Sequence, residues 1–204
     1  MKTEKHLMLD IETMDNKSTA AVIAIGARIF TVEGGPGRGF EVFVDPNTAA
    51  EYGTIGADTM KWWGSQNAHD QAFSGKMHPT TAVFQFIEFV KQQKPAFIWA
   101  NSPEFDIAIM RHLCDQVGLK WPFHYRDARD CRTMFRLGEA LGIDVKRIWG
   151  NPDRKPHLPL DDATTQAEVT AHILKQVFNN QVAYSNPYCD PSLDAPPQPA
   201  QTPV

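Results

Sequence analysis

Hydrophobic and polar residues follow patterns in the first part of the chain that predict β-strands. Residues 6–11 are a short, mostly apolar run that predicts a buried strand, and residues 20–32 are rich in β-branched side chains and predict a second strand. After a glycine- and proline-rich turn at residues 34–37, apolar and polar residues alternate over residues 38–44, which predicts a third strand. The short turns favour an antiparallel meander of these strands.

Later in the chain, apolar residues recur at helical spacing. Asp58 is predicted to cap a helix that carries Met60, Trp62 and Trp63. A further helix is predicted from a cap at Thr80 or Thr81 through Val90, with one apolar stripe.

A strand at residues 96–100 is followed by Ser102 and Pro103, the N-cap and first residue of a predicted helix that ends at Gly118. Two more helices are predicted, one over residues 127–141 that ends at Gly142, and a last one over residues 160–178. Strands first, and then strands alternating with helices, predict an α/β domain with a mixed β-sheet flanked by helices.

The domain is expected to cover residues 1–180, because 204 residues suffice for one domain with a substantial core. Residues 181–204 differ in composition. They are rich in proline and poor in large apolar side chains, which predicts a disordered C-terminal tail.

Charge and cysteine content limit the classes of function. The net charge of −4 argues against a broad phosphate-binding surface, but not against a small site whose positive charge comes from metal ions. The three cysteines have no C-x-x-C spacing and cannot all pair, which favours a reducing, cytoplasmic compartment. The sequence predicts no signal peptide and no membrane span.

Two carboxylates, Asp10 and Glu12, stand two residues apart on the first predicted strand, so both project from the same face. Two such charges on an apolar strand repel each other unless a cation or strong hydrogen-bond donors lie nearby. An exposed pair on an edge strand is the alternative interpretation.

Asp106 and Asp162 each fall in the first turn of a predicted helix, where an anion also compensates the helix dipole. His157 precedes Asp162 by five residues, between Pro156 and Pro159, and a lone histidine in a loop is usually only solvated. Together the three motifs are much more specific. Carboxylates from distant points of the chain can hold two divalent cations, and a nearby histidine can accept a proton from water, which predicts a metal-dependent phosphodiesterase.

These motifs resemble those of the DEDDh 3′–5′ exonucleases of the ribonuclease H-like fold. The resemblance is closest to phage and prophage exonucleases similar to exodeoxyribonuclease VIII and to the related bacterial exoribonuclease domain. It covers about residues 5–178, including two supporting segments at residues 58–63 and 129–133. One difference is at Leu158 and Pro159, where the family often has a small polar residue and alanine, and a stiffer loop here would affect how His157 reaches the water.

The resemblance implies roles for the motif residues. The catalytic set is then His157 with Asp10, Glu12, Asp106 and Asp162. The four carboxylates would hold two divalent cations, Mg²⁺ or Mn²⁺, with Asp10 bridging them and Asp106 supporting the second one, and His157 would be the general base.

Substrate contacts are implied at Thr13, Met14 and Asn101. Trp62 and Trp63 are expected to stack on bases, although core packing is an equal alternative for one of them because adjacent residues do not share a helix face. Contacts of Arg129 and Arg132 with phosphate are also open, and salt bridges to Asp127 or Asp130 are the favoured alternative.

The expected function is therefore release of 5′-mononucleotides from the 3′ end of a nucleic acid strand. The expected partners are single-stranded DNA or RNA 3′ ends, in the cytoplasm of a bacterium or a phage-infected cell, with a homodimer left open. A catalytically inactive nucleic-acid or nucleotide-binding module of the same fold is the alternative, disfavoured because all five polar residues are present. A structural Ca²⁺ site is also disfavoured because no compact D-x-D-x-D-G loop exists.

Overall fold

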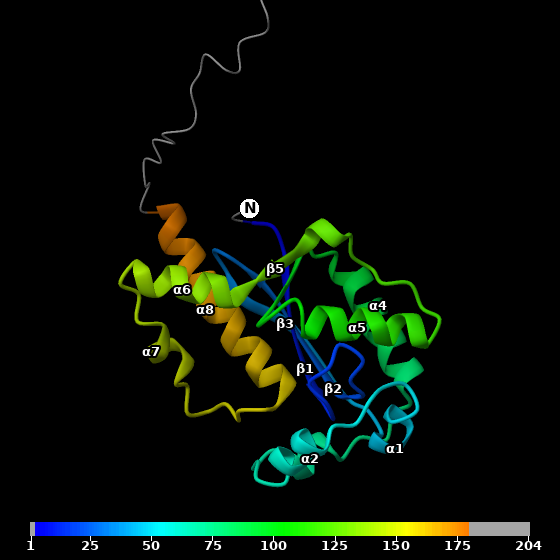
Figure 1. Ribbon diagram of the computed structural model, residues 1–204. Coiled ribbons are helices and arrows are strands. Elements are labelled where there is room, and N and C mark those ends of the chain that lie inside the picture. The colour runs from blue at the N-terminus through cyan, green and yellow to red at the C-terminus, as the bar shows by residue number, and fades with distance from the viewer. Residues whose placement is uncertain (1–2, 180–204) are drawn as a thin grey trace, which may run out of the picture.

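The computed structural model of the chain describes residues 3–179 (Figure 1). Five strands form one sheet: β1 (His6–Thr13), β2 (Val22–Thr31), β3 (Gly35–Phe43), β4 (Phe97–Ala100) and β5 (Ala128–Asp130). The predicted tail, residues 181–204, lies outside the described residues.

The strand order in the sheet is β3-β2-β1-β4-β5. β1, β2 and β3 pair antiparallel, which confirms the predicted meander, whereas β4 is parallel to β1 and to β5. The predicted mixed-sheet α/β fold is therefore confirmed. β1 lies at the centre of the sheet, with antiparallel β2 on one side and parallel β4 on the other.

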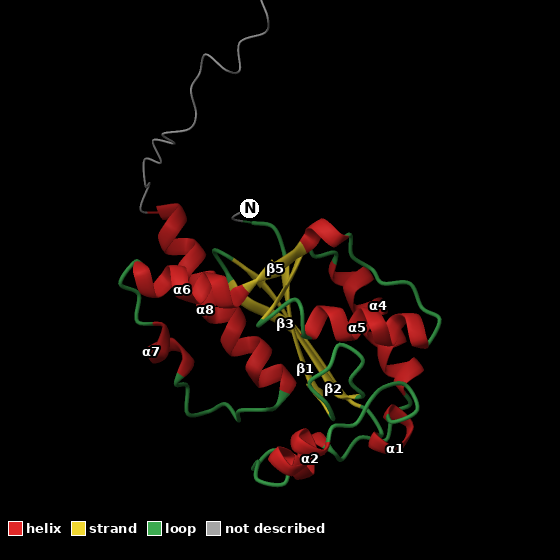
Figure 2. Ribbon diagram, viewed as in Figure 1, coloured by secondary structure: helices red, strands yellow, loops and turns green. Residues whose placement is uncertain are grey.

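Helices cover both faces of the sheet (Figure 2). The helices are α1 (Pro46–Ala49), α2 (Ala57–Trp63), α3 (His69–Ala72), α4 (Pro79–Gln93), α5 (Asp106–Gln116), α6 (Cys131–Ala140), α7 (Val145–Trp149) and α8 (Pro159–Asn179), with a short 3₁₀ turn at Tyr125–Asp127. α4 and α5 pack on one face, and α8 packs on the other face with α6 and α7 beside it (Figure 1). Within residues 3–179, no helix is long and apolar enough to cross a membrane.

The alternation along β1 assigns its side chains to these two faces. Leu7, Leu9 and Ile11 belong to the large apolar core beneath α4 and α5. Met8 packs with Ala163 and Ala167 on the α8 side. Because successive side chains of a strand point to opposite faces, the residues at positions 10 and 12 also face α8.

Several predicted helix starts are displaced in the structure. α2 is preceded by Gly56, so Asp58 lies in its first turn and not at the cap. His78 caps α4 through an N–H···Nδ1 hydrogen bond from Thr80, and Pro79 occupies the first turn. Thr80 and Thr81 were therefore wrong as caps, because Pro79 fixes the start of the helix and places the cap two or three residues earlier, at His78.

The Ser102–Pro103 signal also marks a turn and not the helix itself. The carbonyl oxygen of Ser102 accepts hydrogen bonds from the N–H groups of Phe105 and Asp106, and regular helix starts at Asp106. The predicted helix over residues 127–141 begins only at Cys131, where the Asp130 carboxylate accepts hydrogen bonds from Arg132 N–H and Thr133 N–H. The preceding residues form β5, which is too short to show any alternation.

The predicted helix stops are close to the observed ones. Gly118 follows α5 with φ +70°, and Gly142 follows α6 with φ +78°. Glycine adopts this left-handed conformation without steric cost, which is why it commonly ends helices.

Candidate active site

Asp10 and Glu12 lie at the C-terminal end of β1, on the face that α8 covers. Asp10 is 9% exposed and Glu12 is 8% exposed. The amide of Gln166, on α8, donates a hydrogen bond of 2.7 Å to Oδ1 of Asp10. The two carboxylates are therefore buried between a central strand and a helix, and the alternative of an exposed edge-strand pair is wrong.

Asp106 reaches the same end of β1 from the first turn of α5. The last pair between β1 and β4 joins Leu9 to Ala100, so the backbone of Ile11 lies beyond the end of β4. Oδ1 of Asp106 accepts a hydrogen bond of 3.2 Å from the N–H of Ile11. A carboxylate thus takes the place of the missing strand, and Asp106 is held beside Asp10 and Glu12.

α8 brings Asp162 to the site because its first turn packs tightly on β2. Gly26, the partner of Asp10 in the β1–β2 register, leaves room for this approach. A Cβ atom at position 26 would lie 2.2 Å from the backbone carbonyl carbon of Pro159. Only glycine permits this contact, which fixes where α8 begins and therefore where Asp162 lies.

His157 lies in the loop before α8 and is bound to Asp162 through the backbone. Its N–H donates a hydrogen bond of 2.8 Å to Oδ2 of Asp162, and its φ of +64° is left-handed. The ring is edge-on to Trp62, with centroids 4.9 Å apart. Ligand atoms of Glu12, His157 and Asp162 lie within 4.8 Å of one another.

Two further contacts fix the loop that carries His157. The Arg154 guanidinium donates hydrogen bonds to Thr165 (2.9 Å) and Glu168 (2.5 Å) on α8. Leu158 is 4% exposed and packs in the core, and Pro159 begins the helix. The unusual Leu158–Pro159 pair thus anchors the loop on its C-terminal side while His157 still faces the carboxylates.

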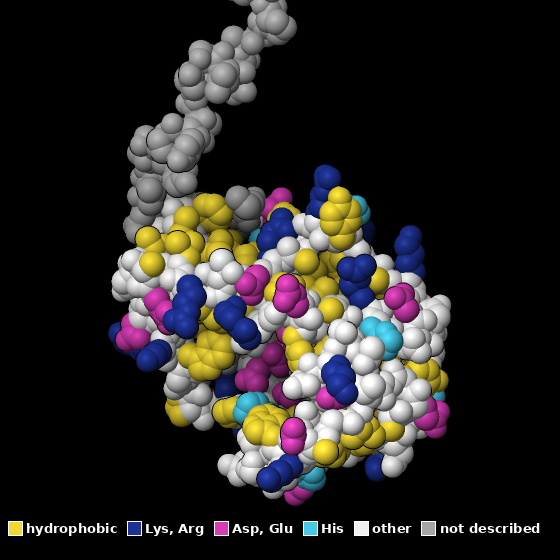
Figure 3. Space-filling view, viewed as in Figure 1, with side chains coloured by type: hydrophobic (Ala, Val, Ile, Leu, Met, Phe, Trp, Pro, Cys, Tyr) yellow, Lys and Arg dark blue, Asp and Glu magenta, His cyan; other side chains and the backbone are white. Residues whose placement is uncertain are grey.

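The four carboxylates and His157 line a cleft of about 300 Å³. Acidic side chains gather in this hollow between α2 and the α6–α8 side of the molecule (Figure 3). The lining consists of the five predicted catalytic residues and six more: Asp10, Glu12, Asp106, His157, Asp162, Ile11, Asn101, Phe105, Trp149, Pro156 and Gln166.

Burial and mutual repulsion disfavour ionisation of the carboxylates. Burial, together with the charges of Asp106, Glu12 and Asp162, raises the pKa of Asp10 well above its ordinary value, although the hydrogen bond from Gln166 opposes the rise. Burial and the neighbouring charges raise the pKa of Glu12 to about 8. Burial raises the pKa of Asp106 to about 7, against the hydrogen bond from Ile11. Burial also raises the pKa of Asp162.

The donor set fits divalent cations. Glu12 is almost fully buried, yet within residues 3–179 no side chain or backbone group donates a hydrogen bond to its carboxylate. Such a group is costly to bury in charged form unless a cation compensates it. The four carboxylates offer the hard oxygen ligands that Mg²⁺ and Mn²⁺ prefer.

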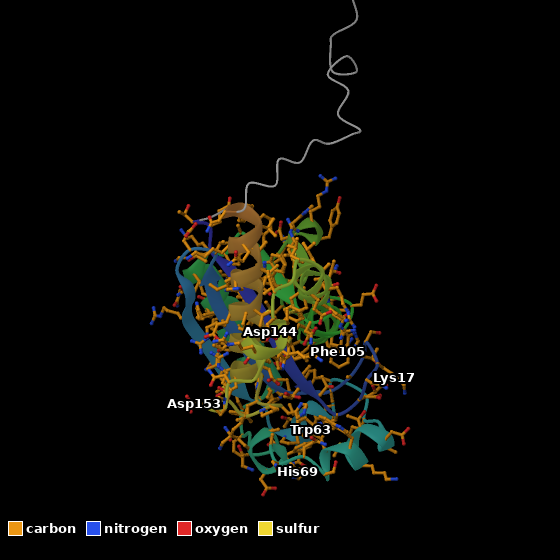
Figure 4. The ribbon with its side chains drawn as sticks, turned by 90° about the vertical axis from the view of Figure 1, so that its left-hand side faces the viewer. Lys17, Trp63, His69, Phe105, Asp144 and Asp153 are labelled. Carbon is orange, nitrogen blue, oxygen red and sulfur yellow. The ribbon has the colours of Figure 1, made fainter. Side chains whose placement is uncertain are left out.

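The predicted substrate-binding residues are distributed unevenly. Asn101 lines the cleft, but Thr13, Met14 and Trp63 are buried, with exposed fractions of 6%, 3% and 1%. Trp63 Nε1–H donates to the Thr13 carbonyl oxygen, and both Trp63 and Phe105 lie near the end of β1 (Figure 4). A ring buried to this degree cannot stack on a base, so Trp63 is a core residue and the exposed neighbour is Trp62, at 41%.

Gln166, Phe105 and Trp149 were not predicted to lie at the site. Gln166 follows Asp162 by four residues on α8, and this i, i+4 spacing is a signal that points to the same helix face. Phe105 precedes Asp106 directly. Trp149 comes from α7, a short helix that sequence periodicity did not indicate, so no local signal identifies it.

Solved structures with a similar fold include Pop2p and exonuclease I. The chain superposes on Pop2p of S. pombe, solved with Mg²⁺ and Mn²⁺ bound, with a TM-score of 0.60, 11% identity, and 88% of this chain and 86% of that chain covered. Exonuclease I gives a TM-score of 0.60 at 14% identity, and the E. coli enzyme in complex with a dA13 oligonucleotide gives 0.57 at 17%. The chain spans about two fifths of the length of exonuclease I, with 42% of that chain covered.

The fold is therefore that of the ribonuclease H-like exonucleases. The sequence itself identifies the family. Residues 5–174 match the family model described as 3′-5′ exoribonuclease Rv2179c-like domain, and the chain belongs to this family. No curated protein matches the sequence.

Proposed function

We propose that the protein is a metal-dependent 3′–5′ exonuclease of the DEDDh type that releases 5′-mononucleotides from a single strand. The observation that carries this proposal is the convergence of Asp10, Glu12, Asp106 and Asp162 with His157 in one cleft. The carboxylates come from β1, α5 and α8, and no structural role explains four mutually repelling acids at one buried position.

Each residue has a role in this proposal. Asp10, Glu12, Asp106 and Asp162 would hold two divalent cations, which would supply stabilisation of the attacking and leaving oxygens in an in-line phosphoryl displacement. His157 accepts the proton of the attacking water, and the backbone hydrogen bond to Asp162 holds it at the carboxylates. Gln166 orients Asp10. Asn101 and Phe105 line the cleft where the terminal nucleotide would lie.

RNA is the favoured substrate because the family description names an exoribonuclease. Pop2p was solved with Mg²⁺ and Mn²⁺, and E. coli exonuclease I with a single-stranded oligonucleotide, which supports the same cations and strand type here. The proposal includes a close relation to phage and prophage exonucleases of the exodeoxyribonuclease VIII type and a cytoplasmic location, and it leaves a homodimer open.

Digestion of matched RNA and DNA oligomers tests the proposal. Wild-type protein is expected to release 5′-mononucleotides with Mg²⁺ or Mn²⁺ and none with EDTA, and a phosphate on the 3′ end of the oligomer is expected to block release. Asp10→Asn, which keeps the shape of the side chain but weakens cation binding, is expected to abolish turnover. Binding of the oligomer without any hydrolysis would favour the alternative of an inactive binding module.

A further inference from the structure

One rim of the cleft carries an exposed tryptophan that the catalytic mechanism does not use. Trp149, at the end of α7, lines the cleft and is 39% exposed. Its ring stands edge-on to Phe135 on α6, with centroids 5.3 Å apart and an interplanar angle of 83°. This contact holds the indole at the rim while leaving part of it open to solvent.

An arginine stands on the same rim. Arg132 is exposed on α6, three residues before Phe135, and its guanidinium donates a hydrogen bond of 3.0 Å to the carbonyl oxygen of Asn101, which lines the cleft. Its charge also opposes the rise of the pKa of Asp106. Arg132 therefore lies beside the cleft, on the same helix as the residue that supports Trp149. We call Arg132, Phe135 and Trp149 the α6–α7 rim.

The structure distinguishes Arg132 from its neighbour Arg129. The carboxylate of Asp130 accepts hydrogen bonds from backbone N–H groups, and within residues 3–179 neither Asp127 nor Asp130 forms an ion pair with either arginine. The Arg129 guanidinium lies over the Phe97 ring, 4.1 Å from its centroid, and donates to backbone carbonyl oxygens. Arg129 thus packs against Phe97, whereas Arg132 is exposed and its guanidinium lies at the edge of the cleft, at the carbonyl oxygen of Asn101.

The small size of the cleft means that most of a bound strand must lie outside it, along a rim. A cleft of about 300 Å³ has room for little more than one nucleotide, so the rest of a bound strand must pass over a rim. Basic side chains lie along α6 next to the acidic hollow (Figure 3). Arg136 lies one helical turn beyond Arg132 but pairs with Glu139, at 2.8 Å. An exposed aromatic ring and an exposed arginine on the same rim fit an unstacked base and its phosphate.

We propose that the α6–α7 rim binds single-stranded nucleic acid on the 5′ side of the bond that is cleaved. Trp149 stacks on a base of the strand, and Arg132 contacts a phosphate. A duplex does not fit this proposal, because its bases present no free face to the indole. The inference rests on the proposed exonuclease function and adds the path of the strand.

Two substrates of different length test the proposal. One is a single-stranded oligomer of about ten nucleotides, as RNA and as DNA. The other is the p-nitrophenyl ester of thymidine 5′-monophosphate, in which nitrophenolate replaces the upstream strand. Trp149→Ala is expected to raise KM for the oligomer roughly 5- to 150-fold, the usual effect of one lost base–aromatic stack, with a much smaller change for the ester. KM is expected to rise by a similar factor for the RNA and the DNA oligomer, because stacking does not depend on the 2′-hydroxyl.

Arg132→Gln is expected to reduce the salt dependence of oligomer binding. Loss of one phosphate contact lowers the slope of log KM against log salt by ~0.7 for a single strand. Matched controls are Phe84→Ala, at a side chain 53% exposed on α4, and Arg38→Ala on β3, at the opposite edge of the sheet. Both controls are expected to leave KM and its salt slope unchanged.

Two results would overturn the proposal. An unchanged KM of the Trp149→Ala protein for the oligomer means that the strand leaves by another rim. An equal loss on oligomer and ester means that Trp149 serves the terminal nucleotide or the fold. Should the wild type hydrolyse neither substrate, the exonuclease function fails independently, and quenching of tryptophan fluorescence by the oligomer in EDTA still tests the rim, since Trp149→Ala must reduce it.

Discussion

At the scale of single residues, Glu12 is expected to hold a proton in the folded protein when no cation is bound. Its ordinary pKa of 4.5 is raised to about 8 because the carboxylate is buried next to Asp162 and Asp106. Between these two values the folded protein holds a proton on Glu12 that the unfolded chain releases. The free energy of unfolding of the metal-free protein therefore falls progressively as the pH rises from about 4.5 to 8, because the unfolded chain holds fewer protons than the folded protein over this range.

Thermal unfolding in EDTA measures this effect. The melting temperature of the wild type is expected to fall between about pH 5 and pH 8, and Glu12→Gln is expected to flatten the profile and raise the melting temperature at the higher pH. Mg²⁺ is expected to stabilise the wild type most at the higher pH, where the carboxylates are free to bind it. Glu51→Gln, an exposed control on the surface, is expected to behave as wild type. A flat wild-type profile would contradict the interpretation.

His157 makes a separate prediction at the residue scale. His157→Ala is expected to lose roughly 10²–10⁴-fold in kcat, the usual contribution of a general base, while cation binding and oligomer binding are retained. Steady-state kinetics and calorimetric titration with Mn²⁺ check both parts.

The control for His157 is His172→Ala, an exposed histidine further along α8 that is expected to keep full activity. Loss of Mn²⁺ binding together with activity in His157→Ala would make His157 a cation ligand. An unchanged rate and pH profile would show that the base lies elsewhere.

At the scale of elements, the contact between β2 and the start of α8 positions the third motif, His157 and Asp162, against the first. Gly26 lies opposite Asp10 in the sheet and against the backbone of Pro159 and Leu160. Gly26→Ala is expected to push the first turn of α8 away from the sheet and to destabilise the fold by about 1–3 kcal/mol, as for other overpacked positions. Because Asp162 and His157 move with that turn, activity and cation affinity are expected to fall further than stability alone explains.

Gly37→Ala is a matched control for that contact. Gly37 lies on β3, the strand next to β2. A Cβ at this position would meet the carbonyl oxygen of Ile29 at 3.4 Å, an ordinary van der Waals distance. Chemical denaturation of both variants measures the loss of stability, and Mn²⁺ titration measures the loss of cation affinity. Normal cation affinity in a folded Gly26→Ala protein would mean that the start of α8 is not fixed by this contact.

At the scale of the whole molecule, every residue assigned to the site lies within residues 3–179. A chain that ends at Tyr184 is therefore expected to keep kcat and KM for a single-stranded oligomer close to those of the full chain, since the removed segment is rich in proline and has few large apolar side chains. Kinetics of the truncated and full-length proteins at equal concentration check this. Loss of activity on truncation would assign the segment to the site or to an essential contact between copies.

The sequence by itself determined the features that depend on local geometry. A spacing of two residues on a strand was enough to put Asp10 and Glu12 on one face, and the first-turn positions of Asp106 and Asp162 follow from short-range helix signals. The glycines after α5 and α6 marked the helix ends because only glycine adopts a left-handed conformation freely. The motif order and the mixed α/β fold could be predicted for the same reason.

Only the tertiary structure decided which side chains surround the carboxylates. Trp62 and Trp63 are adjacent on α2, and packing on the end of β1 buries one ring while the other contacts His157. β5 and α7 are too short for periodicity to reveal them, although α7 brings Trp149 to the rim. These outcomes depend on packing between residues far apart in the chain. Local sequence patterns carry no information about the energies of those contacts.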